Sequence, residues 1–374
     1  MMIGVLNSIE LPQNGELKRD CIIPEESRGL DAETDYDFHT LVYDAFYIPS
    51  KRSICLICPK LLNFEKFIRE GKFTADGEDL RIASIWRFKR YAQIWLRCRR
   101  KPTHLRFQHE LFDAKIPLPQ EQSELFRGLN CAVLKSKDND LNWVRDWTEY
   151  HVRVHGLQGV TFFDNASSRY EPSDILETIR KVPGIKQAQI ISAPFRFGCS
   201  RSLDTLFLQV GLLNIARLRF YSQASAVLCT DLDELVKPVF QSDIFSATWR
   251  SPLGYLLFRG RWRYAMPIPG IDSVRHADHF YRKLDNTCRS TKYCINPQGP
   301  CGFSHWDVHG AVRGFLKDFL TTSKYEYWHC RQISTNWKYD RTESEKHLLE
   351  IDPETASVFD EVFGRNPQHD YMAS

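Results

Sequence analysis

Strand-like and helix-like segments alternate between residues 130 and 233, and this alternation constrains the fold of the chain more than any other feature. The strand-like segments are NCAVLKS at 130–136, VTFFDN at 160–165, QIISAPF at 189–195 and AVLCTD at 226–231. Such alternation favours a mainly parallel sheet flanked by helices. Right-handed crossovers would bring the loops that follow the strands to one sheet edge, where ligands of open α/β sheets bind.

Helical periodicity fills the intervals between these strands. The first interval carries four large side chains on one helical face, followed by Gly156 where a C-terminal cap belongs. These four are Trp143, Trp147, Tyr150 and Val154. Ser173 can cap a second helix that ends near residue 182. A long apolar helix is expected at 203–220, directly before the last strand.

The chain of 374 residues is long enough for two domains. Before residue 113 the pattern changes to the period of strands, for example RIASIWRFK at 81–89, which predicts β structure. The first 35 residues are polar and acidic. We therefore expect a lead-in at 1–35, a smaller β-rich accessory domain at 36–124, an α/β domain at 125–345 and a tail at 346–374.

Composition excludes some classes of function. Fifty Lys and Arg residues face forty-seven Asp and Glu residues, a net charge of +3 that is too balanced to indicate nucleic-acid binding. The basic stretch RCRRK at 97–101 is more typical of a solvated face than of a phosphate or membrane contact. Neither a signal peptide nor a run of about 20 apolar residues stands out. We expect a cytoplasmic protein without a transmembrane segment, and peripheral contact with a membrane stays open.

Eleven cysteines occur without a regular disulfide framework. Cys55 and Cys58 have the spacing of a zinc knuckle, but no second pair lies nearby to complete four ligands. Buried or free thiols in a reducing compartment are therefore expected.

Three carboxylates, Asp231, Asp233 and Glu234, follow the apolar strand at 226–231 directly. In an extended DLD segment the two aspartates point to the same side, and like charges there raise each other's pKa unless a cation neutralises them. Mg²⁺ or Mn²⁺ is the expected cation, because both bind oxygen ligands and bridge carboxylates to phosphates. The alternative is a solvated turn.

Two reactions use an aspartate pair after a strand. An aspartate-dependent phosphatase would also need a later Asp-Asp pair to hold Mg²⁺, and the chain contains no Asp-Asp dipeptide. Transfer of a sugar from a nucleoside diphosphate needs a metal between the acids and the diphosphate, where it stabilises the leaving charge. The position of the acids after three strand-helix units favours the transferase.

Several segments resemble metal-dependent glycosyltransferases of the GT-A fold, a Rossmann-like nucleotide-diphospho-sugar transferase fold. The similarity is greatest to glycosyltransferase family ninety-two and its family-two-like bacterial relatives, and it covers about 130–341. It rests on KDNDLNWVRDWTEYHVRVHGLQGVTFFDNASS at 137–168, LCTDLDELVKP at 228–238, the lysine strand TKYCINP at 291–297, DVHG at 307–310 and YWHCRQISTNWK at 327–338. The chain departs from the family at Asp140, where Glu is usual, at HCR in place of H-Y-R, and at Ser168-Arg169.

The resemblance implies roles for particular residues. Asp164 would hydrogen-bond the nucleobase. Asn139, Asp140 and Asn165 would lie near the nucleotide. Asp231 and Asp233 would hold Mn²⁺ or Mg²⁺. His329, or alternatively His309, would complete the metal site. Arg331 and Lys338 would contact the diphosphate.

The resemblance also implies an inverting hexosyltransferase. Asp307 would be the general base, with Asp272 and Asp278 as alternatives. The donor would be a UDP-sugar, with galactose suggested by the family. The acceptor would be a glycan or lipid-linked glycan in polysaccharide or glycoconjugate biosynthesis. A contrasting hypothesis is a non-catalytic carbohydrate-binding protein on a transferase scaffold.

Overall fold

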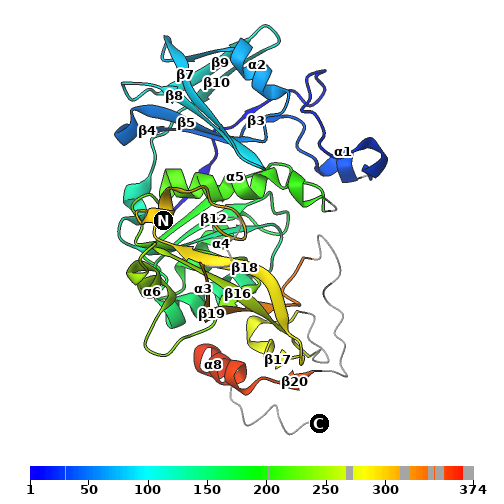
Figure 1. Cartoon of the computed structure of the whole chain (residues 1–374), viewed down its shortest axis with the longest axis vertical. Coiled ribbons are helices and arrows are strands. Elements are labelled where there is room, and N and C mark those ends of the chain that lie inside the picture. The colour runs from blue at the N-terminus through cyan, green and yellow to red at the C-terminus, as the bar shows by residue number, and fades with distance from the viewer. Residues whose placement is uncertain are drawn as a thin grey trace. The chain divides into compact units, whose positions relative to one another are not determined.

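The computed structural model describes residues 1–29, 31–200, 202–266, 273–311, 320–335, 341 and 349–364. It is a mixed α/β protein made of two compact units (Figure 1). The larger unit comprises Met1–Ile3, Phe126–Ile190 and Gln223–Ser374, and the smaller unit comprises Gly4–Leu125 and Ile191–Ser222.

The larger unit is built on a nine-stranded sheet with the strand order β1-β13-β12-β11-β14-β18-β16-β19-β15. Its strands are β1 (Met2–Val5), β11 (Asn130–Ser136), β12 (Gly159–Asp164), β13 (Gln187–Ser192), β14 (Ala226–Cys229), β15 (Glu234–Val236), β16 (Tyr255–Arg263), β18 (Thr287–Ile295) and β19 (Thr321–Cys330). Strand β11 pairs in parallel with both β12 and β14, as the alternating pattern predicts. Beyond β14 the sheet becomes mixed, because β18 runs antiparallel to β14 and to β16. A small sheet pairs β17 (Tyr281–Arg282) with β20 (Glu350–Ile351).

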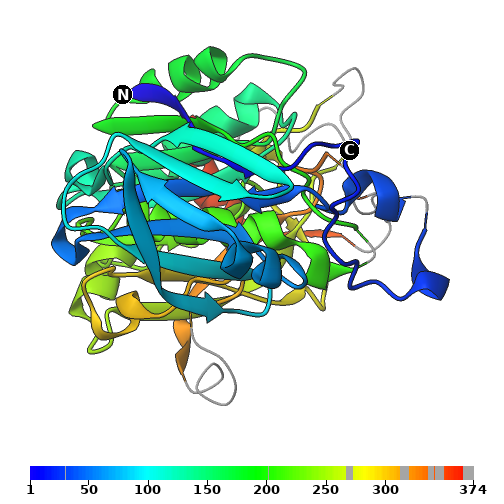
Figure 2. The ribbon, with the colours of Figure 1, turned by 90° about the horizontal axis from the view of Figure 1, so that it is seen from above.

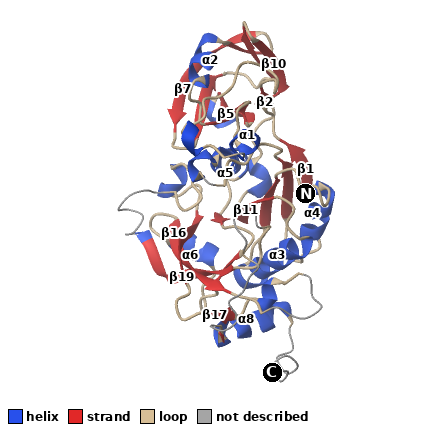
Figure 3. Ribbon diagram, turned by 90° about the vertical axis from the view of Figure 1, so that its right-hand side faces the viewer, coloured by secondary structure: helices blue, strands red, loops and turns tan. Residues whose placement is uncertain are grey.

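Within the described residues, the α-helices of the larger unit are α3 (Leu141–His155), α4 (Pro172–Arg180), α6 (Ile244–Arg250) and α8 (Pro353–Phe363). Figure 3 shows α3 and α4 beside the part of the sheet that contains β11. Asp140 caps the start of α3 and Gly156, with φ 69°, ends it, so the predicted C-terminal cap is confirmed. The cap predicted for α4 is wrong, because Glu171 and Asp174 form a capping box and Ser173 lies inside the helix.

The smaller unit contains a seven-stranded sheet with the order β10-β9-β6-β7-β8-β5-β4, seen from above in blue to cyan in Figure 2. Its strands are β4 (Asp44–Ile48), β5 (Ser53–Pro59), β6 (Lys72–Ala75), β7 (Glu78–Arg87), β8 (Tyr91–Arg97), β9 (His104–His109) and β10 (Phe112–Pro117). A separate pair joins β2 (Ile9–Glu10) to β3 (Thr40–Val42). The helices are α1 (Asp31–Asp35), α2 (Phe64–Glu70) and α5 (Phe207–Ile215). Helix α5 packs closely on the sheet, since a Cβ at Gly211 would lie 2.9 Å from the Tyr43 ring and 3.9 Å from Ile57 of β5.

The predicted domain limits differ from these units at three places. Residues 4–35 are not a loose lead-in, because the Arg19 side chain is buried and donates hydrogen bonds to three backbone carbonyls. Ile191–Ser222 belongs to the smaller unit, where the Arg219 guanidinium pairs with the fully buried Asp44 carboxylate at 2.8 Å. The expected tail at 346–374 contains α8, whose Phe359 side chain joins the core of the larger unit.

The eleven cysteines are all free thiols, and nine of them are buried. Cys55 and Cys58 lie inside strand β5, which confirms the expected buried or free thiols. Within the described parts of the chain, we find no helix that is both long enough and apolar enough to span a membrane.

Candidate functional site

The three acidic residues stand at the carboxyl end of β14, in the middle of the nine-stranded sheet. The strand is fully buried through Cys229, and a short turn carries the chain from Asp231 into β15. Because β11, β12 and β14 are parallel, the ends of β11 and β12 lie at the same edge. Asp164, the last residue of β12, therefore faces the same edge as Asp231.

Two lysines hold the Asp231 carboxylate. Lys135 of β11 lies 2.5 Å from one carboxylate oxygen, and Lys292 of β18 binds the other. Lys292 is only 2% exposed and its Nζ also lies 3.2 Å from Glu234. Burial opposes ionisation of Asp231, but the two ammonium groups outweigh it and hold its pKa well below the usual range. Burial raises the pKa of Glu234 to about 7, although Lys292 pulls it down.

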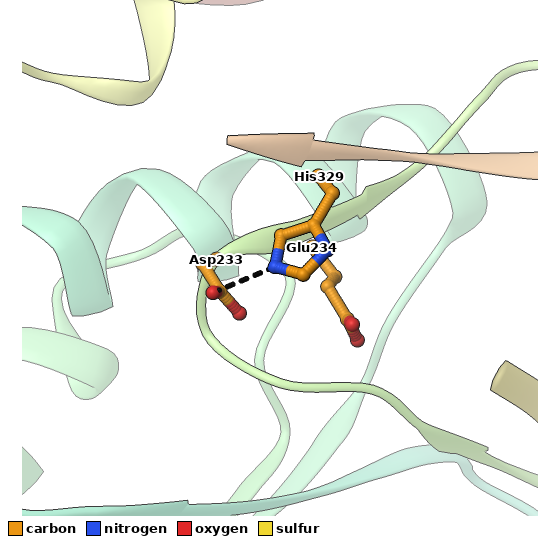
Figure 4. Close-up of side chains that lie close together, drawn as sticks. All are labelled: Asp233, Glu234 and His329. Atoms are coloured by element: carbon orange, nitrogen blue, oxygen red, sulfur yellow. Dashed lines mark hydrogen bonds and ion pairs between the residues drawn. The ribbon is translucent and has the colours of Figure 1, made fainter. Parts of the chain in front are cut away.

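Asp233 faces a different set of cations. Its Oδ2 lies 2.9 Å from His329 Nε2 (Figure 4). The same oxygen lies 2.8 Å from the Arg341 guanidinium. Burial disfavours the charged imidazole, yet the Asp233 carboxylate more than compensates and raises the pKa of His329 to about 10. Trp262 stacks on the same ring with 4.0 Å between the ring centroids.

These contacts correct the electrostatic argument made from the sequence. That argument required a shared divalent ion to neutralise Asp231 and Asp233. In the structure Lys135 and Lys292 neutralise the first aspartate, and His329 and Arg341 neutralise the second. The negative charges of Asp231 and Asp233 are therefore compensated by side chains of the protein itself. Repulsion between the two aspartates does not require a metal ion.

The donor atoms do fit a metal ion. One ligand atom each from Asp233, Glu234 and His329 lies within 4.8 Å of the others. Two carboxylates and an imidazole are ligands that suit Mn²⁺. The grouping follows from the fold, because Glu234 of β15 is the cross-strand partner of His329 on β19. The other ring nitrogen, His329 Nδ1, lies 3.5 Å from the Cys288 sulfur, which orients the imidazole.

Helix α3 holds the short strand β15 from the side opposite β19. Trp147 Nε1 donates to the backbone carbonyl of Glu234 at 2.9 Å, and the Tyr150 hydroxyl donates to that of Val236 at 2.9 Å. His155 Nε2 lies 2.8 Å from the same Val236 carbonyl. These side chains satisfy backbone groups of β15, which is the edge strand in the described order of the sheet. The W-x-x-Y-H segment of the sequence thus positions the backbone that carries Glu234.

Replacing Tyr150 by phenylalanine tests this role of α3. The ring would keep its packing while the hydrogen bond to Val236 is lost, so we expect destabilisation of about 1 kcal/mol and weaker binding of Mn²⁺. Urea denaturation and calorimetric titration with MnCl₂ measure the two effects. A matched control is Tyr264→Phe, since Tyr264 lies outside the α3–β15 contact. Unchanged Mn²⁺ affinity in the Tyr150 variant would contradict a positioning role.

The nucleotide-binding residues inferred from the resemblance have the following contacts. Asp164 accepts hydrogen bonds from the hydroxyl and backbone amide of Ser167, and Asn139 donates to the Ser136 hydroxyl. Asp140 is the α3 cap. Asn165 donates its backbone amide to the Ser136 carbonyl at 2.9 Å. The structure thus brings the ends of β11 and β12 together, and the nucleotide roles themselves stay predictions.

Three further predicted residues, His309, Asp307 and Arg331, have the following contacts. His309 is exposed, and its Nδ1 lies 3.1 Å from the Thr291 carbonyl, so of the two predicted histidines His329 is the one beside Asp233. Asp307 accepts from the Val308 amide, which is a turn-capping contact. Arg331 lies over the Trp262 ring at 5.9 Å.

Asp278, Asp272 and Lys338 were also predicted as site residues. Asp278, an alternative base, accepts from the Arg275 amide at 2.7 Å and so caps a turn. Lys338 and Asp272 lie outside the described residues.

Sequence reasoning missed several residues that shape the site. Lys135, Glu234 as a metal donor and Arg341 were not predicted, and Lys292 was noted only as part of a lysine strand. The sequence does contain a signal for Lys135 and Lys292, because each is a single charge in an apolar strand-like segment. Lys135 lies in NCAVLKS at 130–136, and Lys292 lies in TKYCI at 291–295. A charge in such a run needs a buried partner.

Comparison with known proteins gives no family. No protein-family model matches this chain, and no curated protein matches it. Among solved structures, it is similar to GalNAc-T7 with UDP, GalNAc and Mn²⁺, at a TM-score of 0.34 and 8% identity, over 59% of this chain and 48% of that one. It is also similar to the mannosyltransferase PcManGT from Pyrobaculum calidifontis in complex with GDP-Man and Mn²⁺, at a TM-score of 0.25 and 17% identity, over 36% of each chain. The matched part spans less than half of either protein, and scores this low establish neither the fold nor the activity of this chain.

Proposed function

We propose that this protein is a metal-dependent glycosyltransferase of the GT-A type that moves a sugar from a nucleotide-diphosphate donor. One observation carries the proposal. Asp233, Glu234 and His329 present three donor atoms within 4.8 Å at the carboxyl end of the central strand β14. This edge of an open α/β sheet is where nucleotides bind.

Asp233 and His329 would hold Mn²⁺ or Mg²⁺ with the least rearrangement, because their side chains already meet. The ion would stabilise the negative charge of the departing diphosphate. Arg341 lies 2.8 Å from Asp233 and could turn from the carboxylate to a phosphate oxygen. Lys135 and Lys292 fix Asp231 and neutralise its charge, which reduces the repulsion that an anionic nucleotide would meet.

The finer features are also proposals. The donor would be a UDP-sugar, with Asp164 toward the nucleobase. Transfer would be inverting, with Asp307 as the base that takes the proton from an acceptor hydroxyl. The acceptor would be a glycan or a lipid-linked glycan. Membership of family ninety-two is supported by the motif resemblance alone.

The decisive experiment is a thermal-shift titration combined with an assay of donor hydrolysis. We expect UDP to stabilise the protein only when Mn²⁺ is present. In Asp233→Asn we expect that stabilisation to disappear and turnover of a UDP-sugar to fall on the order of a hundredfold or more. Glu361→Gln, which removes an exposed carboxylate of α8, is the matched control and should behave like the wild type.

Other outcomes would favour the alternatives. Binding of sugars without any transfer or hydrolysis across a panel of nucleotide sugars would indicate a non-catalytic carbohydrate-binding protein. Hydrolysis of simple phosphate esters that depends on Asp231 would indicate a phosphatase. If UDP bound equally well without Mn²⁺ and in Asp233→Asn, the proposed metal dependence would be wrong.

A further inference from the structure

Seven exposed basic side chains gather at one end of the seven-stranded sheet of the smaller unit. They are Lys51, Arg52, Arg81, Arg97, Arg99, Arg100 and Lys101, and we call them the basic cluster. Strand pairing brings them together. Ser53 of β5, which follows Lys51 and Arg52, is opposite Arg97 of β8, and Arg97 is opposite Arg81 of β7. The Cys98 amide donates to the Arg52 carbonyl at 3.0 Å, which ties the two connecting turns to each other.

The charges of the basic cluster are not neutralised by the protein. Arg81 and Arg97 face each other directly across neighbouring strands, an arrangement that is unfavourable for like charges. Within the described parts of the chain, none of the seven side chains forms an ion pair with an acid. The β6–β7 hairpin carries three acids beside the cluster. Asp76 accepts from Thr103, Asp79 pairs with Lys72, and Glu78 makes no ion pair with the seven side chains in the described part of the chain.

Aromatic rings lie beside the basic cluster. Lys51 Nζ lies 4.7 Å from the centre of the Trp95 ring, and Trp86, whose ring is 6.4 Å from Trp95, is 52% exposed. Partial burial, followed by the nearby Arg217 guanidinium, lowers the pKa of Lys51. A bound anion would relieve that unfavourable positive charge.

We propose that the basic cluster binds the surface of a membrane that contains anionic lipids. Clusters of four to eight Lys and Arg residues bind anionic headgroups, and a neighbouring tryptophan prefers the boundary between water and lipid. A half-exposed Trp86 at the rim of the cluster fits that boundary. Nucleic acid is the weaker candidate, because the charge of the whole chain is only +3. The proposal does not depend on the transferase activity.

Co-sedimentation of the full chain with vesicles tests the proposal. We compare vesicles of phosphatidylcholine alone with vesicles that also contain phosphatidylserine, at low and high salt. Binding is expected only to the anionic vesicles and should weaken as salt is raised. Four of the seven charges are removed in the variant R97Q/R99Q/R100Q/K101Q. We expect its affinity for anionic vesicles to fall by at least about tenfold. The matched control removes four exposed lysines elsewhere and should bind like the wild type: K66Q/K115Q/K181Q/K186Q.

The outcomes are distinguishable. Because the four cluster residues make no ion pair and Arg97 faces Arg81, their neutralisation should not lower the thermal unfolding midpoint, so lost binding cannot be ascribed to unfolding. Equal weakening in both variants would mean that general charge, and not the basic cluster, drives binding, and would overturn the proposal. Binding of duplex DNA or of an acidic polysaccharide without binding of vesicles would overturn it as well. So would failure to bind either kind of vesicle at low salt.

Discussion

Replacing Lys292 by methionine is expected to destabilise the larger unit by about 3–5 kcal/mol. The Lys292 ammonium is 2% exposed and lies against both Asp231 and Glu234, and Glu234 is equally buried. Methionine keeps the volume of the side chain but leaves two acids close together without their shared cation. Burial lowers the pKa of Lys292, but Asp231 and Glu234 raise it by more. The Lys292 ammonium is therefore charged at neutral pH. Urea denaturation followed by tryptophan fluorescence measures the loss.

Two further variants show whether the loss comes from the pair. Lys135→Met removes the other partner of Asp231, but that lysine has a single acidic neighbour and the Asp231 side chain is one-third exposed, so a smaller loss is expected. Glu234→Gln, added to Lys292→Met, removes the acid that has lost its lysine and should recover part of the stability. Additive effects of Lys292→Met and Glu234→Gln would contradict a direct interaction between them.

The parallel half of the larger sheet could be predicted from the sequence because its signals are local. Strands β11 and β12 are short apolar runs, and the helix between them shows an apolar face and a glycine cap. Each of these features is set by residues a few positions apart. The edge at which Asp164 and Asp231 gather then follows from the handedness of crossovers alone.

The cations around the acids could not be predicted in the same way. Lys292 is 61 residues from Asp231 and Lys135 is 96 residues from it. Their meeting depends on which strand pairs with β14, and the antiparallel pairing of β14 with β18 leaves no local pattern in the sequence. The choice of Glu234 over Asp231 as the neighbour of His329 likewise depends on the register of β15 with β19.

The predicted domain limits differ from the two compact units for a related reason. Residues 203–220 carry the expected helical pattern, although the α-helix itself covers only Phe207–Ile215 and continues as a π-helical turn at Ala216–Phe220. What the pattern does not reveal is which sheet the helix covers. Its apolar surface packs in the smaller unit, where Arg219 meets Asp44 across 175 positions of sequence.

The affinity of the metal-free protein for Mn²⁺ is expected to rise about tenfold for each pH unit between about pH 8 and 9, where Glu234 is already ionised and His329 still carries its proton. Burial lowers the pKa of His329 and the Asp233 carboxylate raises it, with a net value of about 10 against an ordinary value of 6.5. The imidazole is therefore protonated in this range, and a metal can bind Nε2 only after that proton leaves. The sign for stability is the opposite. Because the folded pKa is the higher one, the His329–Asp233 pair stabilises the fold fully below pH 6.5 and ceases to do so as the pH rises through about 10.

Calorimetric titration with MnCl₂ at a series of pH values, repeated in buffers of different ionisation enthalpy, gives both the affinity and the number of protons released. Near one proton per ion is expected for the wild type, because His329 alone among the donors beside Asp233 has its pKa raised to about 10. His329→Gln should bind weakly and lose the pH dependence. His309→Gln is the matched control, since the resemblance offered that histidine as the other ligand but the structure places it beside Thr291, and it should keep the full dependence. If the pH dependence of Mn²⁺ affinity persisted in His329→Gln and disappeared in His309→Gln, the metal would bind at His309 and not beside Asp233. The proposed site would then be wrong.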